Sequence, residues 1–131
     1  MTALPEWPDG TVAVLSTGAG PPHAIPDSTA VRSGPATVHF ALGLRRESLA
    51  RLREDPRCAL TVIAAGLAVT ALGTATVVEE TERVAFVRLD VGEVQDHDRP
   101  TFALEEGVRW HWTDEDAQRA DAEIRAALRA R

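Results

Sequence analysis

The chain has 131 residues, of which 44% are hydrophobic and 26% charged, and these values predict one globular domain over residues 1–131. Its net charge is −6 and its 14 basic residues are all arginine, which disfavours nucleic acid as a partner because phosphate-tracking surfaces need a positive field. A single cysteine, Cys58, excludes an internal disulfide and favours a reducing cytoplasm, and no apolar run is long enough to predict a membrane span.

β-Branched and apolar residues predict a strand over residues 11–17, followed by a turn rich in glycine and proline. A second extended segment is predicted over residues 23–31. Pro26 within it indicates an edge strand or a bulge, because proline has no N–H to give to a central ladder. Residues 32–35 predict a turn that closes a hairpin with a third strand over residues 36–42.

Residues 46–55 place Leu49 and Leu52 three positions apart among charged neighbours, which predicts a short amphipathic helix that Pro56 ends. The apolar run over residues 58–64 predicts a strand that is covered on both faces.

Two further strands are predicted over residues 67–78 and 84–94, separated by a polar break. Gly73, in the middle of the first of them, marks a place where a bend or bulge costs little.

Near the C-terminus, Val108, Trp110 and Trp112 alternate with polar residues and predict a last strand. Thr113 is expected to be the N-cap of a closing amphipathic helix. The fold class that follows is mainly β (α+β): an antiparallel barrel of six to seven strands, with a short helix after the third strand and a C-terminal helix.

The sequence offers little for hydrolytic or metal chemistry. No serine lies in a G-x-S-x-G elbow, and Cys58 lies in an apolar strand, where core packing is the favoured role. The four histidines lack metal-ligand spacing, and Asp96-His97-Asp98 is typical of a solvated turn. We therefore predict no metal site.

The junction Gly43-Leu-Arg-Arg-Glu-Ser48 lies between the third strand and the short helix. Free N–H groups and the macrodipole favour anions at a helix start, so Arg45, Arg46 and Ser48 are candidates for holding a phosphate. The alternative is an ordinary helix start whose arginines are solvated or paired with Glu47 and Glu54.

Three stretches together carry a resemblance to a known family. These are Gly20-Pro-Pro-His-Ala-Ile-Pro26, the arginine-rich helix start that continues to Asp55-Pro-Arg57, and the strand Thr70-Ala-Leu-Gly-Thr-Ala-Thr-Val-Val78. In this order they resemble the pyridoxamine 5′-phosphate oxidase-like family over roughly residues 10–95.

The resemblance implies a split β-barrel homodimer that binds FMN, or alternatively the deazaflavin F420, at the subunit interface. The implied activity is that of an oxidoreductase acting on a small organic substrate. Carried over by position, the cofactor-binding residues are His23, Ser28, Arg45, Arg46 and Ser48.

The chain also departs from the family pattern. The family's Ser-Arg-Lys signature at the helix start falls on Arg46, Glu47 and Ser48, so a carboxylate stands where arginine is expected. This departure leaves open a cofactor-less split barrel acting as a binding module. A haem-binding relative, with His23 or His111 as axial ligand, is a further alternative. Trp110 and Trp112 are equally compatible with a pocket wall and with the core.

Overall fold

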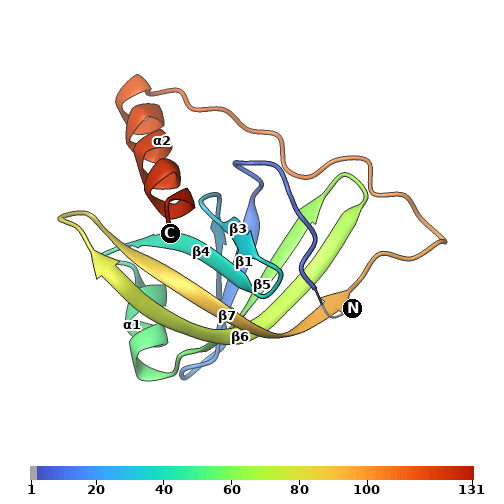
Figure 1. The fold of residues 1–131 in the computed structure, drawn as a ribbon, viewed down its shortest axis with the longest axis horizontal. Helices are drawn as coiled ribbons and strands as arrows, with labels where there is room; N and C mark the ends of the chain where they lie inside the picture. The colour runs from blue at the N-terminus through green and yellow to red at the C-terminus, as the bar shows by residue number, and fades with distance from the viewer. Residues whose placement is uncertain (1–2) are drawn as a thin grey trace.

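The computed structural model describes residues 3–131 as one antiparallel sheet with two helices (Figure 1). Its strands and helices follow the chain as β1 (Ala13–Thr17), β2 (His23–Asp27), β3 (Val31–Gly34), β4 (Thr37–Gly43), α1 (Glu47–Glu54), β5 (Arg57–Ala64), β6 (Leu67–Glu80), β7 (Val84–Asp96) and α2 (Glu115–Arg129). The seven strands are ordered β2-β1-β5-β6-β7-β4-β3. The sheet curves into a barrel but β2 and β3, its two edges, do not pair, which makes this the mainly β split barrel that the sequence predicted.

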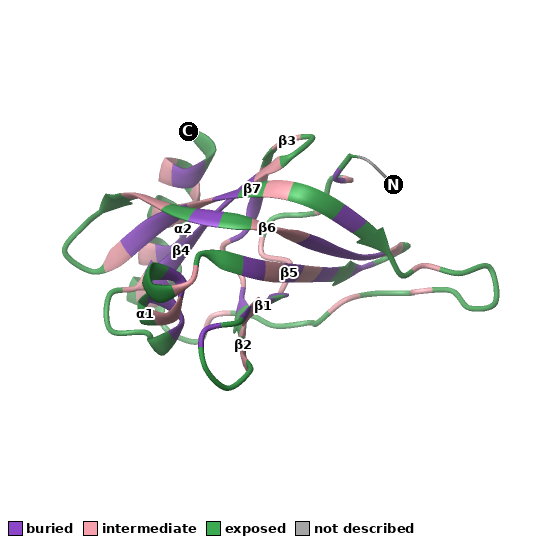
Figure 2. Ribbon diagram, turned by 90° about the horizontal axis from the view of Figure 1, so that it is seen from below, coloured by how far each residue is buried: buried purple, intermediate pink, exposed green. Residues whose placement is uncertain are grey.

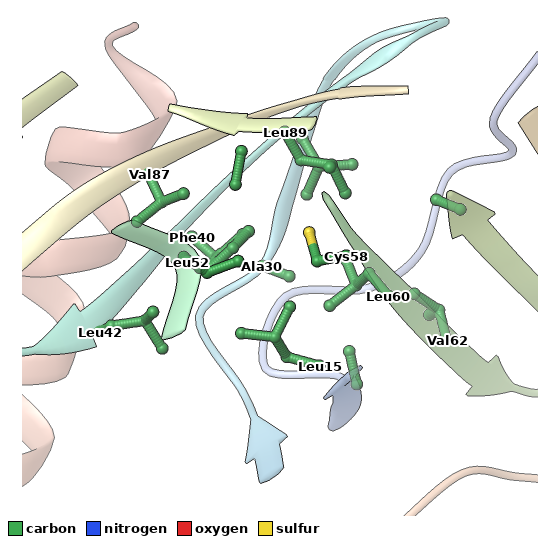
Figure 3. Close-up of a cluster of buried hydrophobic side chains, with 14 of the residues drawn as sticks. Leu15, Ala30, Phe40, Leu42, Leu52, Cys58, Leu60, Val62, Val87 and Leu89 are labelled. Carbon is green, nitrogen blue, oxygen red and sulfur yellow. The ribbon is translucent and has the colours of Figure 1, made fainter. Parts of the chain in front are cut away.

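The main core fills the inside of the barrel. Val38, Phe40 and Leu42 alternate along one face of β4, and all three are buried. Leu49 and Leu52 of α1 close the same core. Figure 3 shows the Cys58 side chain within this cluster, which confirms core packing as its role.

A second, smaller core lies on the other face of β4. Leu128 of α2 packs there with Val31, Ala41 and Phe86, and all four are buried. The two helices therefore lie on opposite sides of β4, as Figure 1 shows. β4 is consequently covered on both faces.

Gly73 permits a close approach between β6 and β7. The pairing register shifts between Leu72 and Gly73, where the bulge was predicted. A Cβ atom at this position would lie 2.1 Å from the carbonyl oxygen of Asp90. No side chain fits such a gap, so glycine is needed here for the backbones to meet.

Pro26 lies in β2, which is an edge strand as its proline predicted. The turn predicted over residues 32–35 was wrong in position, because β3 continues to Gly34 and the turn is formed by Pro35 and Ala36. The cause is a bulge between Arg32 and Gly34 that inserts one extra residue into the hairpin.

Two further expectations were wrong. β5 is covered on one face only, since Ile63 on the other face is 44% exposed. The segment 97–114 contains no strand, and it runs largely exposed between β7 and α2 (Figure 2). Trp110 instead donates its indole N–H to the carbonyl oxygen of Gly10 at 2.9 Å, so side-chain packing on the N-terminal segment produces the alternating pattern.

The C-terminal helix was predicted correctly, but its N-cap was placed one residue early. The carboxylate of Asp114 accepts a hydrogen bond from the backbone N–H of Asp116 at 3.0 Å, and it takes the role expected of Thr113. No helix within residues 3–131 is long and apolar enough to cross a membrane.

Candidate functional site

The candidate site is the junction between β4 and α1. The chain leaves β4 at Gly43, and the N–H of Arg46 donates to the carbonyl oxygen of Gly43 at 3.0 Å, which forms a tight turn. Arg46 is the N-cap of α1, in extended conformation, and its side chain makes no capping hydrogen bond. In the first turn, the N–H of Leu49 donates to the carbonyl oxygen of Arg46 at 3.2 Å, while those of Glu47 and Ser48 have no partner among residues 3–131 and are available to an anion.

His23 and Ser48, two of the predicted cofactor-binding residues, are in contact. The Nε2 atom of His23, at the start of β2, lies 3.1 Å from the hydroxyl oxygen of Ser48 in the first turn of α1. Ser48 is buried, with 1% of its surface exposed. The structure thus brings together two residues that lie 25 positions apart in the sequence.

Glu47, the departure from the family pattern, turns toward the same residues. Its carboxylate accepts a hydrogen bond from Nε of Arg51 at 2.7 Å and lies 3.3 Å from Nδ1 of His23. The hydrogen bond from Arg51, the charge of Arg51 and that of His23 together lower the pKa of this carboxyl. The negative charge that was expected to repel a phosphate is therefore balanced locally.

Arg51 was missed as a residue of this site. Its guanidinium also donates to the carbonyl oxygens of Ala19 and Pro21, so it fastens the β1–β2 turn to α1. The Glu47–Arg51 pair has the i, i+4 spacing of helical ion pairs, which was the signal available in the sequence.

Arg45 and Arg46 are exposed, and neither forms an ion pair with an acidic residue among residues 3–131. Pairing of these arginines with Glu47 and Glu54 is wrong, because Glu47 pairs with Arg51 and Glu54 forms no ion pair within residues 3–131, whereas solvated arginines agree with the observed exposure. Arg46 acts at longer range on the buried carboxyl of Asp27, whose pKa its positive charge lowers against the larger opposing effect of burial.

Ser28 lies apart from this cluster. It lines a cleft of about 350 Å³ together with Asp27, Trp110 and Trp112. The two indole rings pack edge to face, with centroids 5.2 Å apart, so both tryptophans form one wall of this cleft. No hydrogen bond within residues 3–131 joins the Ser28 side chain to the β4–α1 junction, and its cofactor role stays a prediction.

The junction has the composition of a phosphate site. Arg45 and Arg46 supply two guanidinium groups without an acidic partner among residues 3–131, Arg51 balances Glu47, and Ser48 adds a hydroxyl. Guanidinium and hydroxyl groups at a helix start are the groups that hold phosphate in proteins. The phosphate end of a flavin or deazaflavin therefore fits the residues present.

A haem ligand finds less support here. Both ring nitrogens of His23 already have partners, Ser48 and Glu47, and His111 lies in the exposed segment before α2. Within residues 3–131 no three histidine, cysteine or acidic side chains gather as metal ligands would.

Comparison with solved structures finds several proteins of similar fold. The flavin reductase component of a bacterial two-component tryptophan halogenase matches 69% of this chain and 81% of its own length, with a TM-score of 0.61 and 13% identity. A candidate pyridoxamine 5′-phosphate oxidase from Lactobacillus delbrueckii matches 66% of this chain and 84% of its own, with a TM-score of 0.57 and 20% identity.

An F420 reductase also matches 66% of this chain and 90% of its own length, with a TM-score of 0.57 and 13% identity. The chain therefore has the pyridoxamine 5′-phosphate oxidase-like fold that its motifs resemble. No family model and no curated protein matches the sequence.

Proposed function

We propose that this protein is an oxidoreductase that binds FMN, or alternatively F420, and acts on a small organic substrate. The observation that carries the proposal is the start of α1, where Arg45 and Arg46 are exposed and unpaired beside the buried Ser48. Similar folds in a flavin reductase and an F420 reductase support it further.

In this proposal the chain's own residues bind and orient the cofactor. Arg45 and Arg46 hold its phosphate with charge-assisted hydrogen bonds, and the free N–H groups of α1 add the positive end of the helix. Ser48, held by His23, presents a hydroxyl at the same place. When bound, a flavin or deazaflavin supplies the hydride chemistry, so no acid–base side chain of the chain is required for it.

We further propose that the protein is a homodimer. Val14 on β1 and Ile63 on β5 point outward from neighbouring strands and are 40% and 44% exposed. Large apolar side chains on one sheet face are suited to a two-fold contact, since a second copy would cover them. Sedimentation of a monomer at micromolar concentration would contradict this part of the proposal.

The visible spectrum of the purified protein tests the cofactor. We expect absorbance from bound FMN or F420, or, for the colourless protein, a raised unfolding temperature when one of them is added. A ligand at 100 times its dissociation constant adds about 2.7 kcal/mol to the free energy of unfolding. A colourless protein whose unfolding temperature neither compound raises would refute the assignment.

Charge reversal locates the site. Arg45→Glu combined with Arg46→Glu removes two charge-assisted contacts, so we expect the dissociation constant for the cofactor to rise about 100-fold or more. Arg109→Glu with Arg119→Glu is the matched control, because it changes the net charge equally at two other exposed arginines. Equal affinities for the two double variants would place the phosphate elsewhere.

Glu47 favours a second candidate, a split barrel that has lost its cofactor and serves as a binding module. Its carboxylate occupies the first helical position and already ties down His23 and Arg51. The variant Glu47→Gln discriminates between the two. A flavoprotein should bind FMN at least as tightly after the change, whereas a cofactor-less barrel should bind it in neither form.

A further inference from the structure

A second polar cavity lies away from the β4–α1 junction, between the β3–β4 hairpin and the C-terminal end of α2. It has a volume of about 540 Å³. The residues that line it include Ser33, Thr37, His39, Val78, Arg88 and Arg131. None of the lining side chains is a carboxylate, although the whole protein has a net charge of −6.

Ser33 and His39 form a hydrogen-bonded pair at this cavity. The register of the hairpin shifts between Arg32 and Gly34, so Ser33 is the extra residue of a bulge. Its hydroxyl oxygen lies 2.6 Å from Nδ1 of His39. Only 6% of His39 is exposed, and its Nε2 atom has no hydrogen-bond partner among residues 3–131.

Two guanidinium groups flank this pair. Arg88 is the cross-strand partner of His39, and its Nε atom lies 3.2 Å from a carboxylate oxygen of Asp90. Arg131 is bonded to Glu79 and lies over the ring of Phe86. Neither acidic partner is among the residues that line the cavity, and each guanidinium has further N–H groups beyond those given to its partner.

The electrostatics agree with this geometry. Burial, followed by the charges of Arg131 and Arg88, lowers the pKa of His39. The imidazole is therefore neutral at neutral pH and has one ring N–H. When Nδ1 accepts the hydroxyl proton of Ser33, that N–H is on Nε2. In this tautomer the Ser33 proton is used on Nδ1, so the lining donors that remain are the Nε2–H of His39, the hydroxyl of Thr37 and the guanidinium groups of Arg88 and Arg131.

We propose that this cavity binds the phosphate group of a small phosphate monoester, in addition to any cofactor bound at the β4–α1 junction. Arg88, Arg131, Thr37 and the Nε2–H of His39 supply donors for a tetrahedral oxyanion, and Ser33 holds His39 in the tautomer that donates. Val78 provides an apolar wall for the organic part. The two sites are separate, because α1 and α2 pack on opposite faces of β4 and the strand from His39 to Gly43 alone spans about 13 Å.

Calorimetric titration with phenyl phosphate tests the proposal on the full chain. We expect saturable binding with a dissociation constant below about 1 mM, a range ordinary for a ligand of this size. Arg88→Gln should weaken binding about 10-fold or more and Ser33→Ala about threefold. Arg119→Gln is the matched control, since Arg119 is also exposed and lies 3.2 Å from an aspartate oxygen.

Inorganic phosphate and benzoate distinguish the source of any signal. Binding of phenyl phosphate and phosphate, with benzoate weaker, supports a phosphate site. Preference for benzoate, absence of saturable heat, or an unchanged affinity in both Arg88→Gln and Ser33→Ala would overturn it. Ser33 is exposed, so its variant stays informative even when Arg88→Gln fails to fold.

Titration with phenyl phosphate in the presence and absence of FMN tests this inference separately from the proposed function. Phenyl phosphate should bind equally with and without FMN, and Arg45→Glu with Arg46→Glu should leave its affinity unchanged. Competition between FMN and phenyl phosphate would overturn the claim of a separate site while leaving a flavin-binding function intact. Failure of FMN to bind would contradict only the proposed flavin-binding function.

Discussion

The buried carboxyl of Asp27 gives the sharpest stability prediction. Asp27 ends β2 and is 8% exposed, and its Oδ1 atom accepts hydrogen bonds from the N–H and hydroxyl of Thr29 at 2.7 and 2.5 Å. Burial raises the pKa of this carboxyl from 3.8 to about 6, against the opposing effects of Thr29 and the charge of Arg46. Asp27→Asn keeps an oxygen for Thr29 and removes the charge.

The size and sign of the effect follow from linkage. A rise from 3.8 to about 6, at about 1.36 kcal/mol per pKa unit, corresponds to about 3 kcal/mol. Below the unfolded pKa the carboxyl is protonated in both states and costs nothing. As the pH rises from the unfolded pKa to the folded pKa, the unfolded carboxyl ionises while the folded one stays protonated, so the wild type loses stability over this range and Asp27→Asn does not.

Urea unfolding of both proteins between about pH 4 and 8 measures this directly. The free energies of unfolding should coincide near pH 4, and the variant should become more stable by about 2 to 3 kcal/mol at pH 8. Asp55→Asn is the control: a hydrogen bond from Arg57 lowers the pKa of Asp55 to about 2, so this carboxyl is ionised in both states well above its ordinary pKa of 3.8, and the difference between this variant and wild type should stay constant between about pH 5 and 8. A difference for Asp27→Asn that is independent of pH would refute the reasoning.

Three other outcomes are expected. Gly73→Ala should cost about 3 kcal/mol in urea unfolding, because its Cβ meets backbone at 2.1 Å, while Gly34→Ala, with no atom within 4 Å, should cost under about 0.5 kcal/mol. Cys58 should resist a thiol reagent at pH 8 until the protein unfolds, since burial raises its pKa to about 11. Asp114→Ala should lower stability by about 1 kcal/mol through loss of the N-cap, and an equal loss for Thr113→Ala would contradict the assigned cap.

Elements with a strong local pattern were predictable from the sequence. The alternation through Phe40, the charged helix around Leu49 and the apolar run through Leu60 each have one period and one length that fit a single element. Gly73 was also predictable as a bulge, because a glycine inside an apolar strand has few other uses.

The errors came from tertiary context. The exposed face of β5 around Ile63 is apolar, as a covered face would be, so the sequence pattern could not show that only one face of this strand is buried. Trp110 and Trp112 contact each other and line one cleft. Their alternation with polar residues therefore resembles that of a β-strand, although this segment pairs with no other strand. A bulge at Ser33 left no mark in the composition of the hairpin.

The candidate site also has residues that were predictable from the sequence and contacts that only the structure shows. Arg45, Arg46 and Ser48 are near in sequence, so their clustering at one helix start was predictable. The contact between His23 and Ser48 depends on how β2 meets α1, and only the resemblance to a family suggested it. The partners of Glu47 required the structure, because i, i+4 spacing allows a pair with Arg51 but does not select it.

The order of strands also bears on how the chain folds. Four pairings join strands next to each other in sequence, but β1 pairs with β5 and β4 with β7, where Phe40 faces Val87. Strands that are distant in sequence lose loop-closure entropy before their contacts form and stabilise the pairing. We therefore expect folding in milliseconds to seconds rather than microseconds. During synthesis, the apolar residues of β4 must wait for β7 to leave the ribosome, and over that interval the nascent chain depends most on chaperones.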